Sequence, residues 1–309
     1  MLKNHSTFKE SEHGHRCGQV ELVWARNSKD FFFANTIIVH DKSPIIIDPS
    51  ANFTYIRHIA LTQTNHRVIN THYHSDHRAL NGRFPNATFM CHREDAPALR
   101  SWNEFQKRLD SNPDSIYSQW VKRMWQQMHL HETKVSVELE DGDLIETEAH
   151  QLKIIHTPGH TPGLIGVLFT DISLLFTSDI DLTPFGPWYA NEVSDMELFK
   201  QSVEKVRNIE VEHYITSHGM RIFNREQFLS KLDKFEQHFA RREDQILTAL
   251  REGSKTIAEL TALGIIYRSA LLTDLLKVYF SDKMILKHLE PHLAAGSILK
   301  DGERYLFNA

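Results

Sequence analysis

The sequence predicts an α+β fold in which two stacked sheets carry outer helices and a smaller helical unit follows. Three observations support this prediction. Short apolar runs bounded by turn residues, which are typical of strands, fill residues 20–48 and 134–177. Helix-like segments alternate with these groups of strands. Beyond about residue 222 the pattern becomes helical, which divides the chain into domains 1–221 and 222–309.

Domain 1–221 is expected to contain many short strands and few helices. The expected strands are Val20–Ala25, Phe31–His40, Pro44–Asp48, 67–71, Ala87–Cys91, Lys134–Val137, Leu144–Glu146, Leu152–Ile155, Leu164–Phe169, Ser173–Thr177 and 211–216. Helices are expected at Thr54–Leu61, at Met196–Val206 and over residues 94–127. The Asn112-Pro113 pair should break the last of these segments into two helices.

Domain 222–309 begins with one long amphipathic helix. Its apolar face is marked by Phe228, Leu232, Phe235, Phe239, Ile246 and Leu250. Gly253 suits the end of this helix. Three shorter helices are expected at Thr256–Leu263, Ser269–Tyr279 and Asp282–His292. Residues 296–307 read as a hairpin with Asp301-Gly302 at its turn.

Four metal-ligand side chains, His72, His74, Asp76 and His77, lie within six residues directly after the 67–71 strand. Residues i and i+2 of an extended chain point the same way, so His72 and His74 can bind one cation. Asp76 and His77 follow where the chain turns and can face a second cation. The alternative is a polar loop of solvated histidines. In chains with this histidine content, such a motif is expected by chance in roughly one chain in two hundred.

Three later segments place further candidate ligands just beyond the end of an expected strand. They are His160 in the His156-Thr157-Pro158-Gly159-His160-Thr161-Pro162-Gly163 segment, Asp179 after Ser178, and His218 before Gly219. Layered α/β folds gather their sites at the carboxyl ends of strands. Oxygen and nitrogen ligands of this kind suit zinc, iron or manganese.

The series of motifs over residues 20–220 resembles the metallo-β-lactamase superfamily, which implies a four-layer αββα sandwich. The resemblance implies that His72, His74 and His160 bind a first metal ion and that Asp76, His77 and His218 bind a second. Asp179 then resembles the bridging carboxylate. The chain departs from the family pattern in having Ser178, where Gly is frequent, and Arg78–Gly82, where Gly-Gly is frequent. A subset of the superfamily carries a C-terminal winged-helix domain, which residues 222–309 resemble in pattern.

This ligand set implies a hydrolase with two divalent metal ions, for which zinc is expected and iron or manganese is the alternative. Two such ions share a water and lower its pKa from about 15.7 toward 7, so a bridging hydroxide would be the nucleophile. Asp76 is the candidate to orient this nucleophile and move its proton, with a role as ligand alone as the alternative. Asp48 resembles the family carboxylate that supports the 72–77 turn, and a strand-end turn role is its alternative.

The composition of the chain limits which compartment and which binding partners are expected. The net charge is −5 and Cys17 and Cys91 are the only cysteines, which favours a reducing, cytoplasmic setting. No signal peptide or membrane-spanning run is expected. Residues 222–309 hold 13 Lys/Arg and 12 Asp/Glu, so nucleic-acid binding is an alternative that is not favoured. That domain is expected to wall the active site or to support a homodimer.

The expected substrate is a small molecule with a carboxylic ester, thioester or lactone bond. This interpretation follows from the resemblance of residues 156–163 to the segment of glyoxalase II-like and lactonase-like members. A phosphodiesterase or ribonuclease is the alternative, and an iron-dependent persulfide dioxygenase is a further one. The aromatic segment 184–189, which follows Asp179, is expected to line the substrate pocket.

Overall fold

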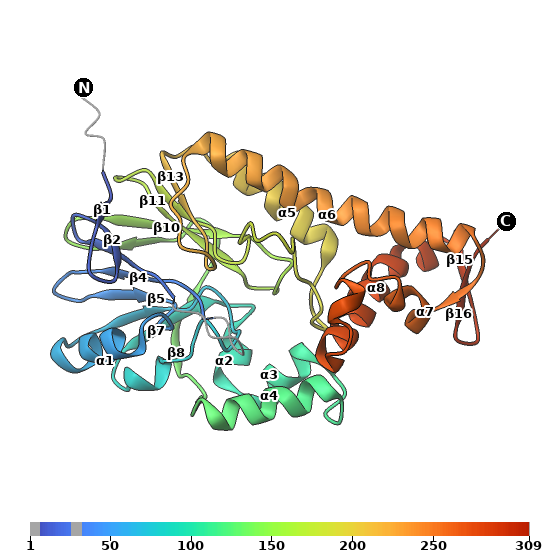
Figure 1. The fold of residues 1–309 in the computed structure, drawn as a ribbon. Coiled ribbons are helices and arrows are strands. Elements are labelled where there is room, and N and C mark those ends of the chain that lie inside the picture. The colour runs from blue at the N-terminus through green and yellow to red at the C-terminus, as the bar shows by residue number, and fades with distance from the viewer. Residues whose placement is uncertain (1–6, 26–32, 309) are drawn as a thin grey trace.

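The computed structural model describes residues 7–25 and 33–308, and Figure 1 shows their arrangement. In this part of the chain the first sheet has eight strands in sequential order. They are β1 (Lys9–Glu10), β2 (Gly14–Cys17), β3 (Val20–Val23), β4 (Thr36–Val39), β5 (Ile45–Ile47), β6 (Arg67–Ile69), β7 (Thr88–His92) and β8 (Val135–Leu139). Strands β1 to β5 pair antiparallel, and β5 to β8 pair parallel. The first two residues of the predicted strand 31–40 lie outside the described residues.

The second sheet has the strand order β13-β12-β11-β10-β9. Its strands are β9 (Leu144–Glu146), β10 (Gln151–His156), β11 (Ile165–Phe169), β12 (Leu174–Phe176) and β13 (His213–Ile215). Buried aliphatic side chains of both sheets form one core between them, for example Ile37 and Ile69 with Ile154 and Val167. The two sheets therefore pack face to face, as predicted.

Helices cover the outer face of each sheet and complete a four-layer αββα sandwich. Helix α1 (Phe53–Thr62) places Ile56 and Ile59 against the outer side of the first sheet. Helix α5 (Met196–Arg207) and helix α6 (Arg225–Arg251) cover the second sheet, where Phe199 and Phe228 lie in one cluster with Leu175. The predicted fold class is confirmed.

The segment between β7 and β8 forms three helices where two were predicted. They are α2 (Ala96–Arg100), α3 (Trp102–Leu109) and α4 (Ile116–Gln127). The additional break falls at Ser101, which has an extended backbone and whose hydroxyl accepts a hydrogen bond from the Glu104 amide. This N-cap begins a new helix at a point where the sequence has neither Gly nor Pro.

The C-terminal region begins with α6, whose 27 residues carry the predicted apolar face. Asn224 and Gln227 form a capping box that fixes its first residue. Strand β14 (Lys255–Thr256), α7 (Ile257–Ala262), α8 (Leu275–Ala294), β15 (Ile298–Asp301) and β16 (Arg304–Phe307) follow. The predicted hairpin is present, since β15 pairs with β16, and β14 adds a third strand.

One C-terminal prediction is wrong, because the two helices expected at 269–279 and 282–292 are largely one continuous helix, α8. A short 3-10 turn, Ser269–Leu271, precedes it. The Ser281 hydroxyl at the expected break donates to the Lys277 carbonyl oxygen one turn earlier, so the polar residue is accommodated within the helix. None of the described helices is long and apolar enough to cross a lipid bilayer.

The C-terminal helices pack against both the second sheet and the inserted helices. Figure 1 shows α8 beside α3 and α4, with α6 running along the upper side of the molecule. Tyr279 of α8 donates a 2.5 Å hydrogen bond to Asp110, at the end of α3, and Phe280 contacts the Tyr117 ring of α4 edge-on. Residues 222–308 are therefore held against the sandwich on the side of the inserted helices.

Candidate metal centre

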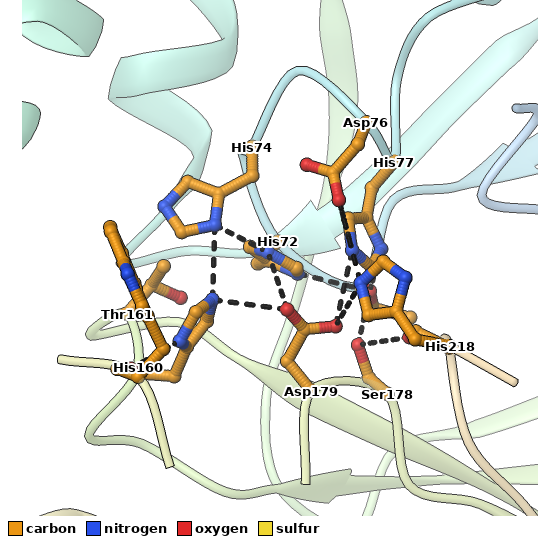
Figure 2. Close-up of polar contacts among 12 residues, drawn as sticks. His72, His74, Asp76, His77, His160, Thr161, Ser178, Asp179 and His218 are labelled. Carbon is orange, nitrogen blue, oxygen red and sulfur yellow. Dashed lines mark hydrogen bonds and ion pairs between the residues drawn. The ribbon is translucent and has the colours of Figure 1, made fainter. Parts of the chain in front are cut away.

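The first ligand group consists of His72, His74 and His160. The chain turns directly after β6 at His72 and His74, and His160 lies in the loop between β10 and β11. His74 Nδ1 lies 2.9 Å from His72 Nε2 and 3.0 Å from His160 Nε2. Three imidazole nitrogens thus converge on one point, as Figure 2 shows.

The second ligand group consists of Asp76, His77 and His218. The Nε2 atoms of His77 and His218 each lie 3.5 Å from Asp76 Oδ2. His218 follows β13, while Asp76 and His77 end the turn after β6. One ligand atom from each of the three residues lies within 4.8 Å of the others.

Asp179 joins the two groups because its carboxylate oxygens face opposite sides. Its Oδ2 lies 3.2 Å from His160 Nε2 and 3.9 Å from His72 Nε2. Its Oδ1 lies 3.1 Å from His77 Nε2 and 3.8 Å from His218 Nε2. All seven residues that the sequence nominated therefore meet in one place, although they span nearly 150 positions (Figure 2).

In the first group, His74 and His160 each have a second ring nitrogen that points away from the centre and contacts a polar group. His160 Nδ1 lies 2.8 Å from the Trp188 carbonyl oxygen and donates to it. His74 Nε2 lies 2.6 Å from the side-chain amide of Asn191. Both partners belong to the loop of residues 185–191, which follows the Asp179 segment.

In the second group, His77 is supported instead by residues at the carboxyl ends of β5 and β6. His77 Nδ1 lies 2.8 Å from Asp48 Oδ2 and is fully buried with it. Asp48 also accepts hydrogen bonds from the Thr71 amide and the Thr71 hydroxyl, at 2.8 and 2.6 Å. The resemblance implied such a supporting role for Asp48, with a strand-end turn residue as the alternative, and in the structure its carboxylate contacts both His77 and Thr71.

Burial and the charges within the cluster shift the pKa values of its members in different directions. Burial and the neighbouring histidines lower the pKa of His72 and His74 well below the usual value. Burial would also lower the pKa of His77, but the carboxylates of Asp179, Asp76 and Asp48 raise it well above that value. Burial opposes ionisation of Asp179, yet the surrounding histidines hold the pKa of this carboxyl well below its usual range.

The donor set fits divalent cations. Because His160 Nδ1 donates to a carbonyl, a neutral His160 presents a bare lone pair on Nε2. This atom lies 3.0 Å from His74 Nδ1, which in turn lies 2.9 Å from His72 Nε2. The buried atoms His77 Nε2 and Asp179 Oδ1 have no hydrogen bond of good geometry among the described residues. Converging lone pairs with such unsatisfied atoms are stabilised by positive charge between them, and nitrogen and oxygen ligands suit zinc, iron or manganese.

Ser178, where the superfamily that the sequence resembles often has Gly, adopts the left-handed backbone conformation that favours Gly, with φ of 50°. Its hydroxyl lies 2.7 Å from Thr71 Oγ1 and 3.3 Å from Ser217 Oγ. Since the Thr71 hydroxyl donates to Asp48, Ser178 donates to Thr71. The serine thus extends the hydrogen-bond chain that ends at Asp48 and His77.

A second buried carboxyl, Asp95, holds the loop that carries His160. It accepts hydrogen bonds from the Thr161 hydroxyl at 2.7 Å and from the Gly163 amide at 2.9 Å. Arg108 lies 3.7 Å away. Burial raises the pKa of Asp95 to about 6 despite these favourable contacts.

Sequence reasoning did not identify Asp95 or Asn191 as part of the site. Both are fully buried polar residues. Asp95 lies at the start of the inserted helices, and Asn191 lies in a loop without a motif. The available signal for Asn191 was its position just beyond the aromatic segment 184–189, which had been assigned to the substrate pocket alone.

Comparison with known proteins agrees with this geometry. The sequence profile of the metallo-beta-lactamase superfamily matches residues 30–218, which is more than half of the chain. The chain belongs to the metallo-β-lactamase superfamily. A crystal structure of a metallo-beta-lactamase family protein from Thermus thermophilus superposes with a TM-score of 0.70 at 19% identity, covering 94% of this chain and 99% of that one. This likeness concerns the fold alone, and it includes most of the C-terminal region.

Two curated relatives match part of the chain. A hydroxyacylglutathione hydrolase of Cereibacter sphaeroides (strain ATCC 17029 / ATH 2.4.9) is 31% identical over 123 residues, which are 40% of this chain and 48% of that protein. The acyl-coenzyme A thioesterase MBLAC2 of Homo sapiens is 28% identical over 115 residues, 37% of this chain and 40% of that protein. The chain thus spans about half the length of the curated relatives it matches, or less.

Proposed function

We propose that this protein is a hydrolase that binds two divalent metal ions and cleaves thioesters. One observation carries the metal-dependent part of the proposal: the two oxygens of Asp179 each face a different ligand group. A carboxylate in this position can bridge two ions bound by His72, His74 and His160 on one side and Asp76, His77 and His218 on the other. Zinc is the expected metal, and iron or manganese is the alternative.

When bound, the two ions supply a nucleophilic water at neutral pH and polarise the acyl oxygen. Asp76 is the residue proposed to handle the proton. Its side chain is 23% exposed and lies at the edge of the second group, so it can reach both water and substrate. Its carboxylate accepts a proton as the water oxygen attacks the acyl carbon, and it returns this proton to the thiolate when the carbon–sulfur bond breaks.

The choice of a thioester is supported by the two curated relatives, whose names specify thioester substrates. It is also supported by aromatic side chains beside the first ligand group. The Trp188 ring lies 5.9 Å from the His74 ring and 5.3 Å from that of Phe280, and Phe280 contacts Tyr117. Trp188 and Phe280 are half-buried and come from separate parts of the chain, and we propose that they offer apolar surface to an acyl group, with the buried Tyr117 ring packed against Phe280.

Carboxylic esters and lactones react by the same addition to an acyl carbon and belong to the same proposal. A phosphodiester is the second candidate substrate, because a two-metal centre can also stabilise phosphoryl transfer. The charge balance of residues 222–309 does not favour a polyanionic substrate.

We further propose that residues 222–309 form a winged-helix-like domain, given their helices and three-stranded sheet. The cytoplasmic location and the homodimer stay predictions.

The proposal is tested by elemental analysis of the purified chain together with a substrate panel. The panel contains a hydroxyacylglutathione, an acyl-coenzyme A, an oxygen ester, a lactone, a phosphodiester, a single-stranded RNA and a persulfide with oxygen. We expect two ions per chain and thioester hydrolysis that a chelator abolishes and added metal restores. Cleavage of the phosphodiester or RNA alone, or oxygen uptake with the persulfide, would replace thioester hydrolysis with the corresponding activity.

A further inference from the structure

The 185–191 loop lies between the first ligand group and the C-terminal helices. On one side it supplies the Trp188 carbonyl oxygen to His160 and the Asn191 amide to His74. On the other side it contacts α6 and α8. Its position is therefore determined by residues that lie well beyond the sandwich in sequence.

The main anchor on α6 is Arg242, whose side chain is completely buried. Its guanidinium donates to the Pro187 carbonyl oxygen at 2.7 Å and to the Phe185 carbonyl oxygen at 2.6 Å. It also lies over the rings of Phe185 and Tyr189, at 4.8 and 5.6 Å. Hydrogen bonds from a charged donor are the strong ones, so this residue fixes the backbone on either side of Gly186.

Two further contacts hold the 185–191 loop close to α6 and α8. The Tyr189 hydroxyl lies 2.8 Å from His288 Nε2 of α8. Gly186 has φ of 82°, and a Cβ at this position would lie 2.5 Å from the His238 ring of α6. Glycine is thus required both by the backbone conformation and by the close approach of the helix.

The contact with His74 determines which ring nitrogen is available to an ion. His74 Nδ1 faces the centre, so a neutral ring that binds an ion there must carry its proton on Nε2. That N–H needs an acceptor, and the group at 2.6 Å is the side-chain amide of Asn191. An amide can present its oxygen or its nitrogen at the same place. With the oxygen toward His74, the amide nitrogen is left to donate to Tyr117, whose hydroxyl lies 3.3 Å from the other end of the amide.

We propose that the 185–191 loop, anchored by Arg242, is the element through which the C-terminal helices set the first metal site. Asn191 and the Trp188 carbonyl oxygen are the positioning groups, since they hold the protons of His74 and His160 on the nitrogens that face away from the ion. The inference rests on the proposed metal-binding function. It adds that His74 and His160 of the first ligand group depend on the C-terminal region through this loop, whereas His77 of the second group is held by Asp48 of the sandwich.

The test compares metal binding in four variants of the full chain. Asn191→Leu removes the acceptor at similar volume, and Asn191→Asp keeps an oxygen acceptor. Arg242→Met removes the anchor but keeps its apolar length. Arg207→Met is the matched control, because Arg207 also contacts α6, through Asp233 and Glu236, but lies away from the loop. The readouts are ions per chain by elemental analysis, affinity by competition with a chelator, and the visible spectrum of the cobalt-substituted protein.

We expect Asn191→Leu and Arg242→Met to lower the affinity for one of the two ions by about 10- to 100-fold. This is the usual effect of removing a hydrogen-bond partner of a metal ligand. The other ion should stay bound, so that metal content falls from two per chain toward one. Asn191→Asp and Arg207→Met should retain both. Two tightly bound ions in Asn191→Leu, or equal loss in Asn191→Leu and Asn191→Asp, would overturn the inference while leaving the hydrolase proposal intact.

If Arg242→Met fails to fold, the Asn191 pair still decides whether the loop positions His74, because these substitutions leave the anchor in place. An unaltered chain that binds no zinc, iron or manganese would overturn the proposed function and this inference together.

Discussion

The first and second ligand groups differ in which part of the chain holds their imidazole rings. His74 and His160 depend on the 185–191 loop and, through Arg242, on helices that begin at residue 225. His77 of the second group depends instead on Asp48, which Thr71 supports, at the ends of neighbouring strands of the first sheet. His77 is thus held locally within the sandwich, whereas the contacts of His74 and His160 are completed only when distant helices pack.

The largest effect is expected where the two ligand groups meet. Asp179→Ala removes the carboxylate shared by both groups, so both ions should be lost or displaced. Because metal ions supply several kcal/mol of transition-state charge stabilisation, thioester hydrolysis should fall by about 10³-fold or more. Turnover and ions per chain are measured on the same preparation, and circular dichroism verifies that the helices remain. Retained turnover in this variant would contradict the bridging role.

The next effect concerns Asp95, which supports the first group indirectly through the His160 loop. Its pKa of about 6 in the folded protein exceeds the ordinary 3.8 because of burial. The unfolded chain therefore loses this proton first as pH rises, so folding becomes less favourable between about pH 4 and pH 6. The loss should reach about 3 kcal/mol above pH 6.

Asp95→Asn cannot ionise, yet its side-chain oxygen can still accept from the Gly163 amide. The variant should therefore gain stability relative to the unaltered chain as pH rises from 4 to 7. Urea unfolding of both chelator-treated proteins at each pH gives the difference directly. Parallel pH profiles for the two proteins would contradict the raised pKa.

The sequence predicted the seven side chains that converge better than it predicted the residues that hold them in place. His72, His74 and Asp76 are recognisable from their spacing, because an extended strand followed by a turn places them without knowledge of the remaining fold. The supporting role of Asp48 was suggested by the family resemblance, at the last residue of an apolar run, with a turn role as the alternative. The roles of Asn191 and Arg242 were not, since they arise only when α6 packs on the 185–191 loop. The break at Ser101 was missed because a single capping hydroxyl determines it.

A substitution at Asp48 tests the support of His77 in the same way that the Asn191 variants test the support of His74. Asp48→Asn places an N–H where Thr71 and His77 both require an acceptor, at 2.6 and 2.8 Å in the native contacts. We expect the affinity for the second ion to fall by about 10- to 100-fold while the first ion stays bound. Cobalt substitution and chelator competition are measured beside Asn191→Leu. Loss of the same ion in both variants would show that the two ligand groups are not independently supported.

The smallest expected effect is at Ser178, where strain and a hydrogen bond oppose each other. Ser178→Gly relieves the left-handed backbone but loses the hydroxyl that donates to Thr71, so its stability should stay within about 1 kcal/mol of the unaltered chain.

Ser178→Ala loses the same hydroxyl and keeps the strain, so it should be less stable than Ser178→Gly by about 1 kcal/mol. Urea unfolding of the three proteins measures both differences, and metal content should stay at two ions in each because no ligand changes. If Ala were as stable as Gly, the positive φ at this position would cost nothing. The hydrogen-bond chain to Asp48 would then account for the effect of a serine beside Asp179.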